Sequence, residues 1–166
     1  YHINGIALID ECFSLDENRV LAFCERIRPY HLAWACQMRA ETYTDRVLRA
    51  MKESGCIGAC FGIESMSETT LTNMNKHLDP KIIEQALLLT YKYRLGCTGN
   101  LIFGAETETF STIAESLTWH RQHSMRYHNH PVRQFAYIQT YPGSIYYANA
   151  LKNGKIPDKY LSLIHI

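Results

Sequence analysis

Short apolar runs alternate along the chain with longer segments in which apolar residues recur every three or four positions. The short runs are typical of buried strands, and the longer segments are typical of helices that bury one face. The strands are expected at residues 3–9, 32–38, 57–63, 97–103 and 135–140. Because each interval between strands has room for a helix, the pattern predicts five βα units.

The helices that fill these intervals carry start and stop signals. Ser14 and Glu17 have the S-x-x-E spacing of a capping box, and Val20, Cys24 and Ile27 then share one helical face. A second helix is expected from Thr44 to Gly55, with Val47, Leu48 and Met51 on its buried face. A third is expected from Asp79-Pro80 to Gly96, with Ile83, Ala86, Leu87 and Thr90 on its buried face. Two more are expected from about Thr109 to His123 and from Pro142-Gly143 to Gly154. Threonine, aspartate and proline favour helix starts, and glycine favours helix ends.

Most of the expected strands are apolar on both faces, which indicates a parallel sheet covered by helices. Such βα units form either an open, doubly wound sheet or a closed barrel. An eight-stranded barrel needs about 250 residues, so a chain of 166 residues is too short to complete one. In both architectures the chemistry lies at the carboxyl ends of the strands.

The composition is that of one globular domain. Hydrophobic residues make up 46%, and 17 Lys+Arg stand against 16 Asp+Glu, so the formal net charge is +1. These values exclude a disordered chain and a chain whose overall charge attracts nucleic acid, and no apolar run approaches the roughly 20 residues of a membrane-spanning helix. Six cysteines are too sparse for a disulfide scaffold. They indicate a reducing compartment, and a cytoplasmic location is expected.

Polar residues follow every expected strand. In chain order they are Asp10-Glu11, Gln37 with Arg39, Glu64-Ser65, Asn100 with residues 104–109, and residues 140–144. Each group alone fits a helix cap as well as a binding site. Because the carboxyl ends of parallel strands meet at one edge, the groups together predict a site on that rim.

Residues 55–65 read G-C-I-G-A-C-F-G-I-E-S, and Leu71, Met74, Asn75 and Lys76 follow them in an L-x-x-M-x-K run. These segments resemble the G-I-E-S strand of radical S-adenosylmethionine (radical SAM) enzymes and the run that follows it in that family. Upstream of these segments, residues 10–13 resemble the family's D-[DE]-x-F strand end, and Trp34 with Arg39 resembles its next strand. Downstream, residues 101–109 resemble the h-h-h-G-x-P-G-E-T segment. Residues 141–154 resemble the P-G-[ST]-x-x-Y segment that is common in cobalamin-domain members. The ordered set covers nearly all of residues 1–160.

The resemblance has two departures. Glu106-Thr107 stand where the family usually has Pro-Gly, and the C-x3-C-x2-C motif that binds a 4Fe-4S cluster is absent. Cys56 and Cys60 have the first spacing, but no third cysteine follows, and a cysteine in an apolar strand usually packs as a small hydrophobe.

The resemblance begins at the family's third strand, so the cluster-binding segment is expected upstream of Tyr1. Residues 161–166 resemble a translated transposon-adapter sequence, and the alternative is a short terminal strand. The resemblance therefore implies an α/β fold in which residues 1–160 form a partial (β/α) barrel of about five βα units, with a parallel sheet, helices on its outer face and an exposed first-strand edge. Residues 161–166 are expected to be a non-native tail.

The resemblance also implies roles for residues on the rim. Carried over by position, Asn100 faces the ribose of S-adenosylmethionine, Glu64 or Ser65 the ribose or adenine side, and Gln37 or Arg39, with Lys76, the methionyl amino-acid end. An arginine fork suits a carboxylate because it binds both oxygens. The alternatives are that Arg39 and Lys76 are surface cations paired with a neighbouring helix, and that Asn100 is a hydrogen-bonded core amide.

The function implied is that of a fragment of a radical SAM enzyme, which uses S-adenosylmethionine and a 4Fe-4S cluster to generate a deoxyadenosyl radical for methyl transfer, cyclisation or rearrangement. The fragment alone is expected to be inactive. Cobalamin is a further candidate cofactor, and the expected partners are a small-molecule substrate and an electron donor such as flavodoxin or ferredoxin. The alternatives are another α/β-barrel enzyme and a degenerate, non-catalytic barrel that acts as a binding module.

Four histidines, His120, His123, His128 and His130, lie within eleven residues. His120 and His123 are three positions apart and share a face if the helix continues, as two zinc ligands do. Because the helix is expected to end there, solvated loop residues are the favoured interpretation, and a zinc site and a contact to substrate are the alternatives.

Overall fold

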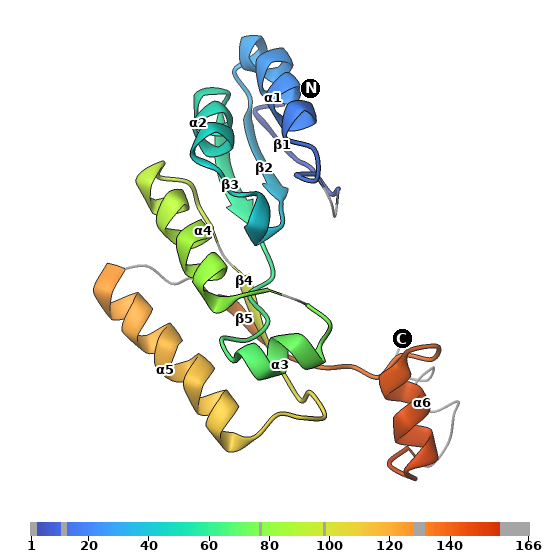
Figure 1. Cartoon of the computed structure of the whole chain (residues 1–166). Coiled ribbons are helices and arrows are strands. Elements are labelled where there is room, and N and C mark those ends of the chain that lie inside the picture. The colour runs from blue at the N-terminus through green and yellow to red at the C-terminus, as the bar shows by residue number, and fades with distance from the viewer. Residues whose placement is uncertain (1–2, 11–12, 77, 98, 128–131, 157–166) are drawn as a thin grey trace. The chain divides into compact units, whose positions relative to one another are not determined.

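Five short strands alternate with helices in the part of the chain that the structure describes (Figure 1). This structure is a computed structural model, and it describes residues 3–10, 13–76, 78–97, 99–127 and 132–156. In chain order the elements are β1 (Gly5–Ala7), α1 (Glu17–Ile27), β2 (Ala33–Gln37), α2 (Asp45–Glu53), β3 (Cys56–Cys60), α3 (Glu68–Asn73), α4 (Pro80–Lys92), β4 (Gly99–Phe103), α5 (Phe110–Tyr127), β5 (Val132–Tyr137) and α6 (Ile145–Lys152). The chain divides into two compact units, residues 1–136 and 137–166.

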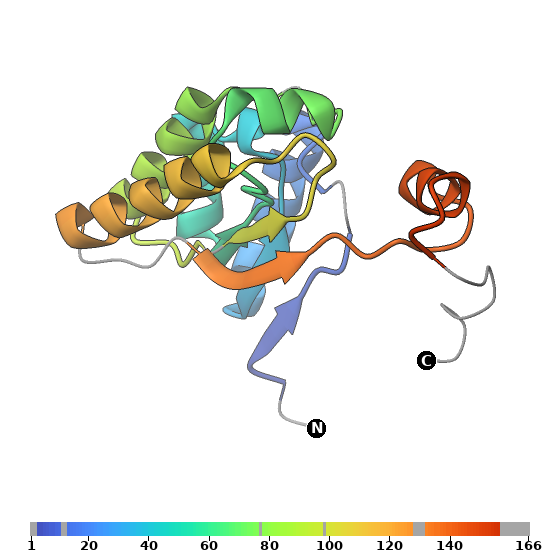
Figure 2. The same ribbon diagram turned by 90° about the horizontal axis from the view of Figure 1, so that it is seen from below.

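The strands of the first unit are parallel, which confirms the α/β prediction. β1, β2 and β3 form one sheet in that order, with Gly5 opposite Ala33 and Cys36 opposite Ala59. β4 and β5 form a second pair, and their arrows point the same way in Figure 2. Two isolated parallel bridges link these sheets: Gly58 of β3 pairs with Gly96 just before β4, and Glu64 after β3 pairs with Leu101 of β4.

The sheets are shorter than the sequence predicts. Regular pairing of β3 stops at Cys60, and Glu64 beyond it has a left-handed backbone with a φ of 63°. A left-handed residue cannot continue a pleated strand, so only bridges link β3 to β4. All of β1 is exposed, and so are Ile3 and Ile9 beside it, which confirms the exposed first edge.

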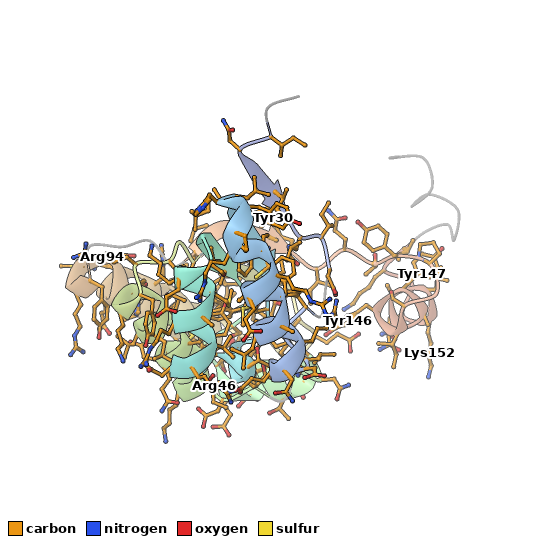
Figure 3. All side chains as sticks on the ribbon, turned by 90° about the horizontal axis from the view of Figure 1, so that it is seen from above. Tyr30, Arg46, Arg94, Tyr146, Tyr147 and Lys152 are labelled. Atoms are coloured by element: carbon orange, nitrogen blue, oxygen red, sulfur yellow. The ribbon has the colours of Figure 1, made fainter. Side chains whose placement is uncertain are left out.

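Helices cover one face of the first sheet and bury the side chains that β2 and β3 direct toward them. α1 and α2 lie side by side in Figure 3, with Tyr30 and Arg46 at opposite ends of this helical layer. The core beneath includes Trp34, which is fully buried and donates a hydrogen bond from its indole nitrogen to the carbonyl of Ser54 at 3.1 Å. None of the helices in the described ranges is long and apolar enough to cross a membrane.

The local signals place most helices correctly. The expected buried faces of α1, α2 and α4 are confirmed, and Thr44 and Asp79 cap α2 and α4. α1 differs at its start, because Asp16 is the N-cap and accepts hydrogen bonds from the backbone of Asn18 and Arg19. The Ser14 hydroxyl lies instead in the interior.

Three further boundaries differ from the prediction. α5 continues to Tyr127, one turn beyond His123, and α4 ends at Lys92 rather than at Gly96. β5 begins at Val132 rather than at residue 135. The sequence pattern also missed α3, a helix of six residues that is too short to show a helical period.

The second unit contains α6. Ser144 caps this helix by accepting a hydrogen bond from the backbone nitrogen of Tyr147 at 3.1 Å, and Gly154 follows the helix with a φ of 64°. These positions agree with the expected start and end. Residues 161–166, the expected tail, lie outside the described residues.

Candidate functional site

A cavity of about 880 Å³ lies in the first unit, at the carboxyl ends of β1, β2 and β3. Its wall also includes the chain after α3 and the first residues of β4. The lining residues are Ala7, Leu8, Ile9, Ala35–Ala40, Cys60, Phe61, Gly62, Glu64, Asn75, Lys76, Leu78, Gly99, Asn100 and Gln134. The position agrees with the rim that parallel strands predict.

Five of the six residues that the sequence singled out line this one cavity: Gln37, Arg39, Glu64, Lys76 and Asn100. Asn100 is exposed on the wall, so the alternative of a core amide is wrong. The residues come from four separate segments, and only the tertiary fold brings them together.

Ser65 lies elsewhere. Its side chain is buried, and its hydroxyl oxygen lies 3.2 Å from that of Ser116 on α5 and accepts a hydrogen bond from the backbone of Ser67 at 3.1 Å. Ser116 also accepts a hydrogen bond from the backbone nitrogen of Met66 at 2.9 Å. Ser65 therefore holds the loop after β3 against α5.

Glu64 sits where the chain passes from the first sheet to the second. Its backbone nitrogen donates to the carbonyl of Asn100, and its own carbonyl accepts from Ile102, each at 2.8 Å. A left-handed backbone costs a residue with a side chain about 1–2 kcal/mol. The two hydrogen bonds to β4 hold Glu64 in this conformation.

The Glu64 carboxylate forms an ion pair with Lys76. The Lys76 Nζ lies 2.7 Å from Oε1, and the Glu64 side chain is only 15% exposed. Lys76 follows Asn75, whose φ is 57°, and the Lys76 backbone nitrogen donates to the carbonyl of Leu71 at 2.9 Å. The end of α3 thus delivers a cation to the cavity wall.

Arg39 is the second cation on the wall. Its guanidinium lies 2.6 Å from the carboxylate of Glu41, and its backbone nitrogen donates to the Ser14 hydroxyl at 3.1 Å. Burial raises the pKa of Glu41, but the hydrogen bond from Arg39, a backbone hydrogen bond and the charges of Arg39 and Lys76 together outweigh burial and hold the pKa below its usual value. Asp10, after β1, pairs with Arg19 of α1 at 2.5 Å.

The five described cysteines are thiols and not disulfides. Cys36 and Cys60 line the cavity, and of the five only Cys60 is partly exposed. The hydrogen bond with Cys56, together with burial, raises the pKa of Cys36, and burial raises that of Cys97. These thiols therefore stay protonated at neutral pH.

Within the described ranges, no group of three or more histidine, cysteine, aspartate or glutamate side chains is arranged to hold a metal ion.

His123 is a buried part of the contact between α4 and α5. Its Nε2 lies 2.7 Å from the hydroxyl of Tyr91, and its Nδ1 lies 3.2 Å from the carboxylate of Glu84. Burial lowers the pKa of His123, although Glu84 opposes that shift. The interpretation as a solvated loop residue is therefore wrong, because α5 continues past this position. His128 and His130 lie outside the described residues.

Sequence reasoning assigned no role to several lining residues. Gly62 belongs to the G-I-E-S segment, but its importance depends on where the Glu64 carboxylate lies. Gln134 lies on β5, just before the expected start of that strand. Asn75 stands in the L-x-x-M-x-K run, but the resemblance gave it no role of its own.

Solved structures with a similar fold are radical SAM enzymes. The radical S-adenosylmethionine methyltransferase TsrM from Kitasatospora setae, bound to its tryptophan substrate and a SAM analogue, superposes with a TM-score of 0.65 at 13% identity, over 79% of this chain and 26% of that chain. The radical SAM enzyme HemN of Escherichia coli, a coproporphyrinogen III oxidase, superposes with a TM-score of 0.60 at 15% identity, over 77% of this chain and 30% of that chain. The cobalamin-dependent S-adenosylmethionine radical enzyme OxsB superposes with a TM-score of 0.64 at 18% identity, over 71% of this chain and 19% of that chain.

These likenesses show that the chain has the fold found in part of radical SAM enzymes, including cobalamin-dependent ones. They confirm the resemblance that the ordered motifs carry.

A curated relative agrees with this result. The chain is 29% identical over 155 residues to the uncharacterized methyltransferase PH0819 of Pyrococcus horikoshii, which covers 92% of this chain. The chain spans about a third (33%) of the length of that relative. No protein-family model matches the chain.

Proposed function

We propose that this chain is the part of a radical SAM enzyme that holds S-adenosylmethionine in the cavity at the strand ends. The observation that carries the proposal is the convergence of Gln37, Arg39, Glu64, Lys76 and Asn100 on that cavity. Its volume of about 880 Å³ is within the range of small-molecule sites, about 300–1,000 Å³.

The chemistry of the wall fits the cofactor. S-adenosylmethionine carries a carboxylate, an ammonium and ribose hydroxyls, which need cations, acceptors and neutral hydrogen-bonding groups. In the proposed arrangement Arg39 or Gln37, with Lys76, serves the methionyl end, and Asn100 serves the ribose. Glu64 serves the ribose or adenine side, because Ser65 is turned toward α5.

The 4Fe-4S cluster is assigned to the whole parent protein. Since no metal-holding group exists among the described residues, the part proposed for this chain is to bind and orient the cofactor. Together with the cluster, bound S-adenosylmethionine would supply radical chemistry, and the walls of the cavity would exclude water from it.

For the parent protein we propose a partial barrel completed by further βα units and a methyl-transfer reaction on a small-molecule substrate. Methyl transfer is favoured over cyclisation or rearrangement because TsrM and the relative from P. horikoshii are both described as methyltransferases. Cobalamin is the proposed second cofactor, a flavodoxin or ferredoxin the proposed electron donor, and the cytoplasm the proposed location.

Calorimetric titration of the 166-residue chain with S-adenosylmethionine and with S-adenosylhomocysteine tests the binding proposal. Saturable binding is expected for both ligands, weakened about tenfold or more by Asn100→Ala or Arg39→Ala, the loss of one good hydrogen bond or more. The control is Arg46→Ala, since Arg46 is an exposed arginine on α2 outside this cavity. Absence of saturable binding, or equal binding by all variants, would overturn the proposal.

The activity of the parent needs a separate test. Anaerobic reconstitution of the parent protein with iron and sulfide should yield 5′-deoxyadenosine when S-adenosylmethionine and a reductant are added. Binding of S-adenosylmethionine without any 5′-deoxyadenosine would instead support the alternative of a non-catalytic binding module.

A further inference from the structure

The contact between α4 and α5 joins a phenol, an imidazole and a carboxylate by hydrogen bonds. The two helices lie side by side in Figures 1 and 2. The hydroxyl of Tyr91 lies 2.7 Å from Nε2 of His123, whose Nδ1 lies 3.2 Å from both carboxylate oxygens of Glu84. The His123 side chain is only 1% exposed, so it depends on these two partners for its hydrogen bonds. None of the three residues lines the cavity at the strand ends.

The carboxylate decides the direction of these hydrogen bonds. Because a carboxylate only accepts, the Nδ1 of His123 that faces Glu84 carries the imidazole proton. Nε2 is then the acceptor, and Tyr91 donates its phenolic proton to it. Glu84 also accepts a hydrogen bond from the indole nitrogen of Trp119 at 2.9 Å, which holds the carboxylate in place. The phenolic proton therefore points at a buried base.

This geometry is suited to the one-electron oxidation of a phenol. A phenol that loses an electron becomes a strong acid, so its oxidation at neutral pH needs an acceptor for the proton. A base can take a proton directly only from a group within hydrogen-bond reach, which His123 is. The imidazolium that forms would lie beside the Glu84 carboxylate, which stabilises it in the interior, whereas the charge of Arg126 opposes it.

Oxidisable side chains connect this contact with the cavity. Cys60 lies on the cavity wall, and Tyr43 is buried in the core. Burial, and with it the thiols of Cys97 and Cys60, raises the pKa of Tyr43, while burial and Cys97 raise the pKa of Tyr91. These groups are therefore neighbours in the interior. An electron can pass between such side chains in short steps, so an oxidant at the cavity wall can draw an electron from Tyr91.

We propose that Tyr91 is a redox-active tyrosine, with His123 as its proton acceptor and Glu84 as the countercharge. A thiyl radical at the cavity wall takes one electron from Tyr91, and its sulfur becomes a thiolate that takes a proton from the solvent. The phenolic O–H bond breaks, and its proton forms an N–H bond at Nε2 of His123. The products are a thiol, a neutral phenoxyl radical and an imidazolium. The site carries stray radicals away from the cavity. This inference goes beyond the proposed function and rests on it only for the source of radicals.

Flash photo-oxidation of the 166-residue chain tests the site. The oxidant is ruthenium(III) tris-bipyridine, generated in solution by a light flash, and high-field EPR of rapidly frozen samples detects the phenoxyl radical. A hydrogen bond to the phenoxyl oxygen lowers its largest g value, so this signature is expected in the wild type. The signal should disappear in Tyr91→Phe and persist in the matched control Tyr93→Phe. Tyr93 lies at the same end of α4, but beside Asp45 and Arg49 rather than an imidazole.

His123→Gln distinguishes proton transfer from a structural role. Glutamine can still accept the hydrogen bond from Tyr91, but it cannot take up the proton at neutral pH. The hydrogen-bonded phenoxyl radical should therefore form about tenfold or more slowly, because a positioned base is lost. A purely structural role predicts an unchanged rate. Spectra of the backbone amides establish that each variant is folded, and His123→Gln provides the test if Tyr91→Phe does not fold.

The outcomes separate the two proposals, because the oxidant is added from outside and no S-adenosylmethionine is needed. A hydrogen-bonded phenoxyl signal that persists in Tyr91→Phe overturns the inference, and so does an equal rate in the wild type and His123→Gln. A chain that binds S-adenosylmethionine but forms no Tyr91 radical loses the inference and keeps the proposed function. A chain that forms the radical without binding S-adenosylmethionine loses the proposed function and keeps Tyr91 as a redox site.

Discussion

The close approach of β4 to the chain after β3 predicts that Gly99 cannot carry a side chain. A Cβ at this position would lie 2.6 Å from the carbonyl oxygen of Phe61 and 2.6 Å from Cγ1 of Ile63. These distances are about 1 Å inside the usual optimum of about 3.5–4.0 Å between nonbonded atoms. Phe61 presents backbone, and Ile63 is fully buried, so neither neighbour can move aside at little cost.

The magnitude follows from two opposing effects. Overpacking of a well-filled interior costs about 1–3 kcal/mol, and a double clash that includes backbone belongs in the upper part of that range. Alanine recovers about 0.4–1 kcal/mol by restricting the unfolded chain. Gly99→Ala should therefore lower the free energy of unfolding by about 2 kcal/mol, which corresponds to a fall in Tm of about 4–8 °C for a chain of this size.

Urea denaturation followed by circular dichroism, together with thermal unfolding, measures this change. The control is Gly58→Ala, because the new Cβ would lie 3.4 Å from the carbonyl oxygen of Gly96 and 3.7 Å from Cβ of Ala35, both ordinary contacts. Its free energy of unfolding should stay within about 1 kcal/mol of wild type. If the two variants are equally stable, β4 does not approach the chain after β3 as closely as described.

Three further predictions follow from the ionisable groups. Burial lowers the pKa of His123 below its usual 6.5, so the unfolded chain binds more protons than the folded chain at acid pH. The free energy of unfolding should therefore decrease as the pH falls from 7 to 5. His123→Gln should remove part of that pH dependence. An equal slope in His123→Gln would contradict the assignment. The hydrogen bond from Lys92 holds the pKa of Asp45 at about 2, and Lys92→Met should raise it toward 3.8 in a carbon-13 NMR titration, with no change counting against the ion pair. In a Cys12→Ser background, iodoacetamide should modify Cys60 about tenfold or more faster than the buried cysteines, because the buried thiols react only after local opening. Mass mapping of the modified sites measures the order of reaction. A buried cysteine that reacts before Cys60 would contradict the prediction.

Local rules were sufficient for the helices whose caps and faces depend on near neighbours. Asp79, Pro80 and the buried face of α4 were all predicted correctly, because each signal acts within a few residues of the helix. The capping box at Ser14 was wrong, because its hydroxyl accepts the backbone N–H of Arg39 at 3.1 Å and the hydroxyl of Thr42 at 2.7 Å. Those partners lie more than twenty residues away and are invisible to local patterns.

The same division applies to the candidate site. The sequence placed Gln37, Arg39, Glu64 and Asn100 on one rim, because parallel strands end at a common edge whatever their detailed packing. Lys76 came from the motif resemblance, and the structure places it in the same cavity.

By itself, then, the sequence determined the alternation of strands and helices, the shared edge of the parallel strands and the family resemblance. The tertiary structure alone decided that Ser65 turns toward α5, that the Glu64 carboxylate lies where a side chain at position 62 would project, and that Glu64 pairs with Lys76. The physical reason is range. Hydrophobic period and capping act between near neighbours in the chain, whereas the direction of a side chain at a strand end is set by hydrogen bonds and steric limits from segments that meet only in the folded protein.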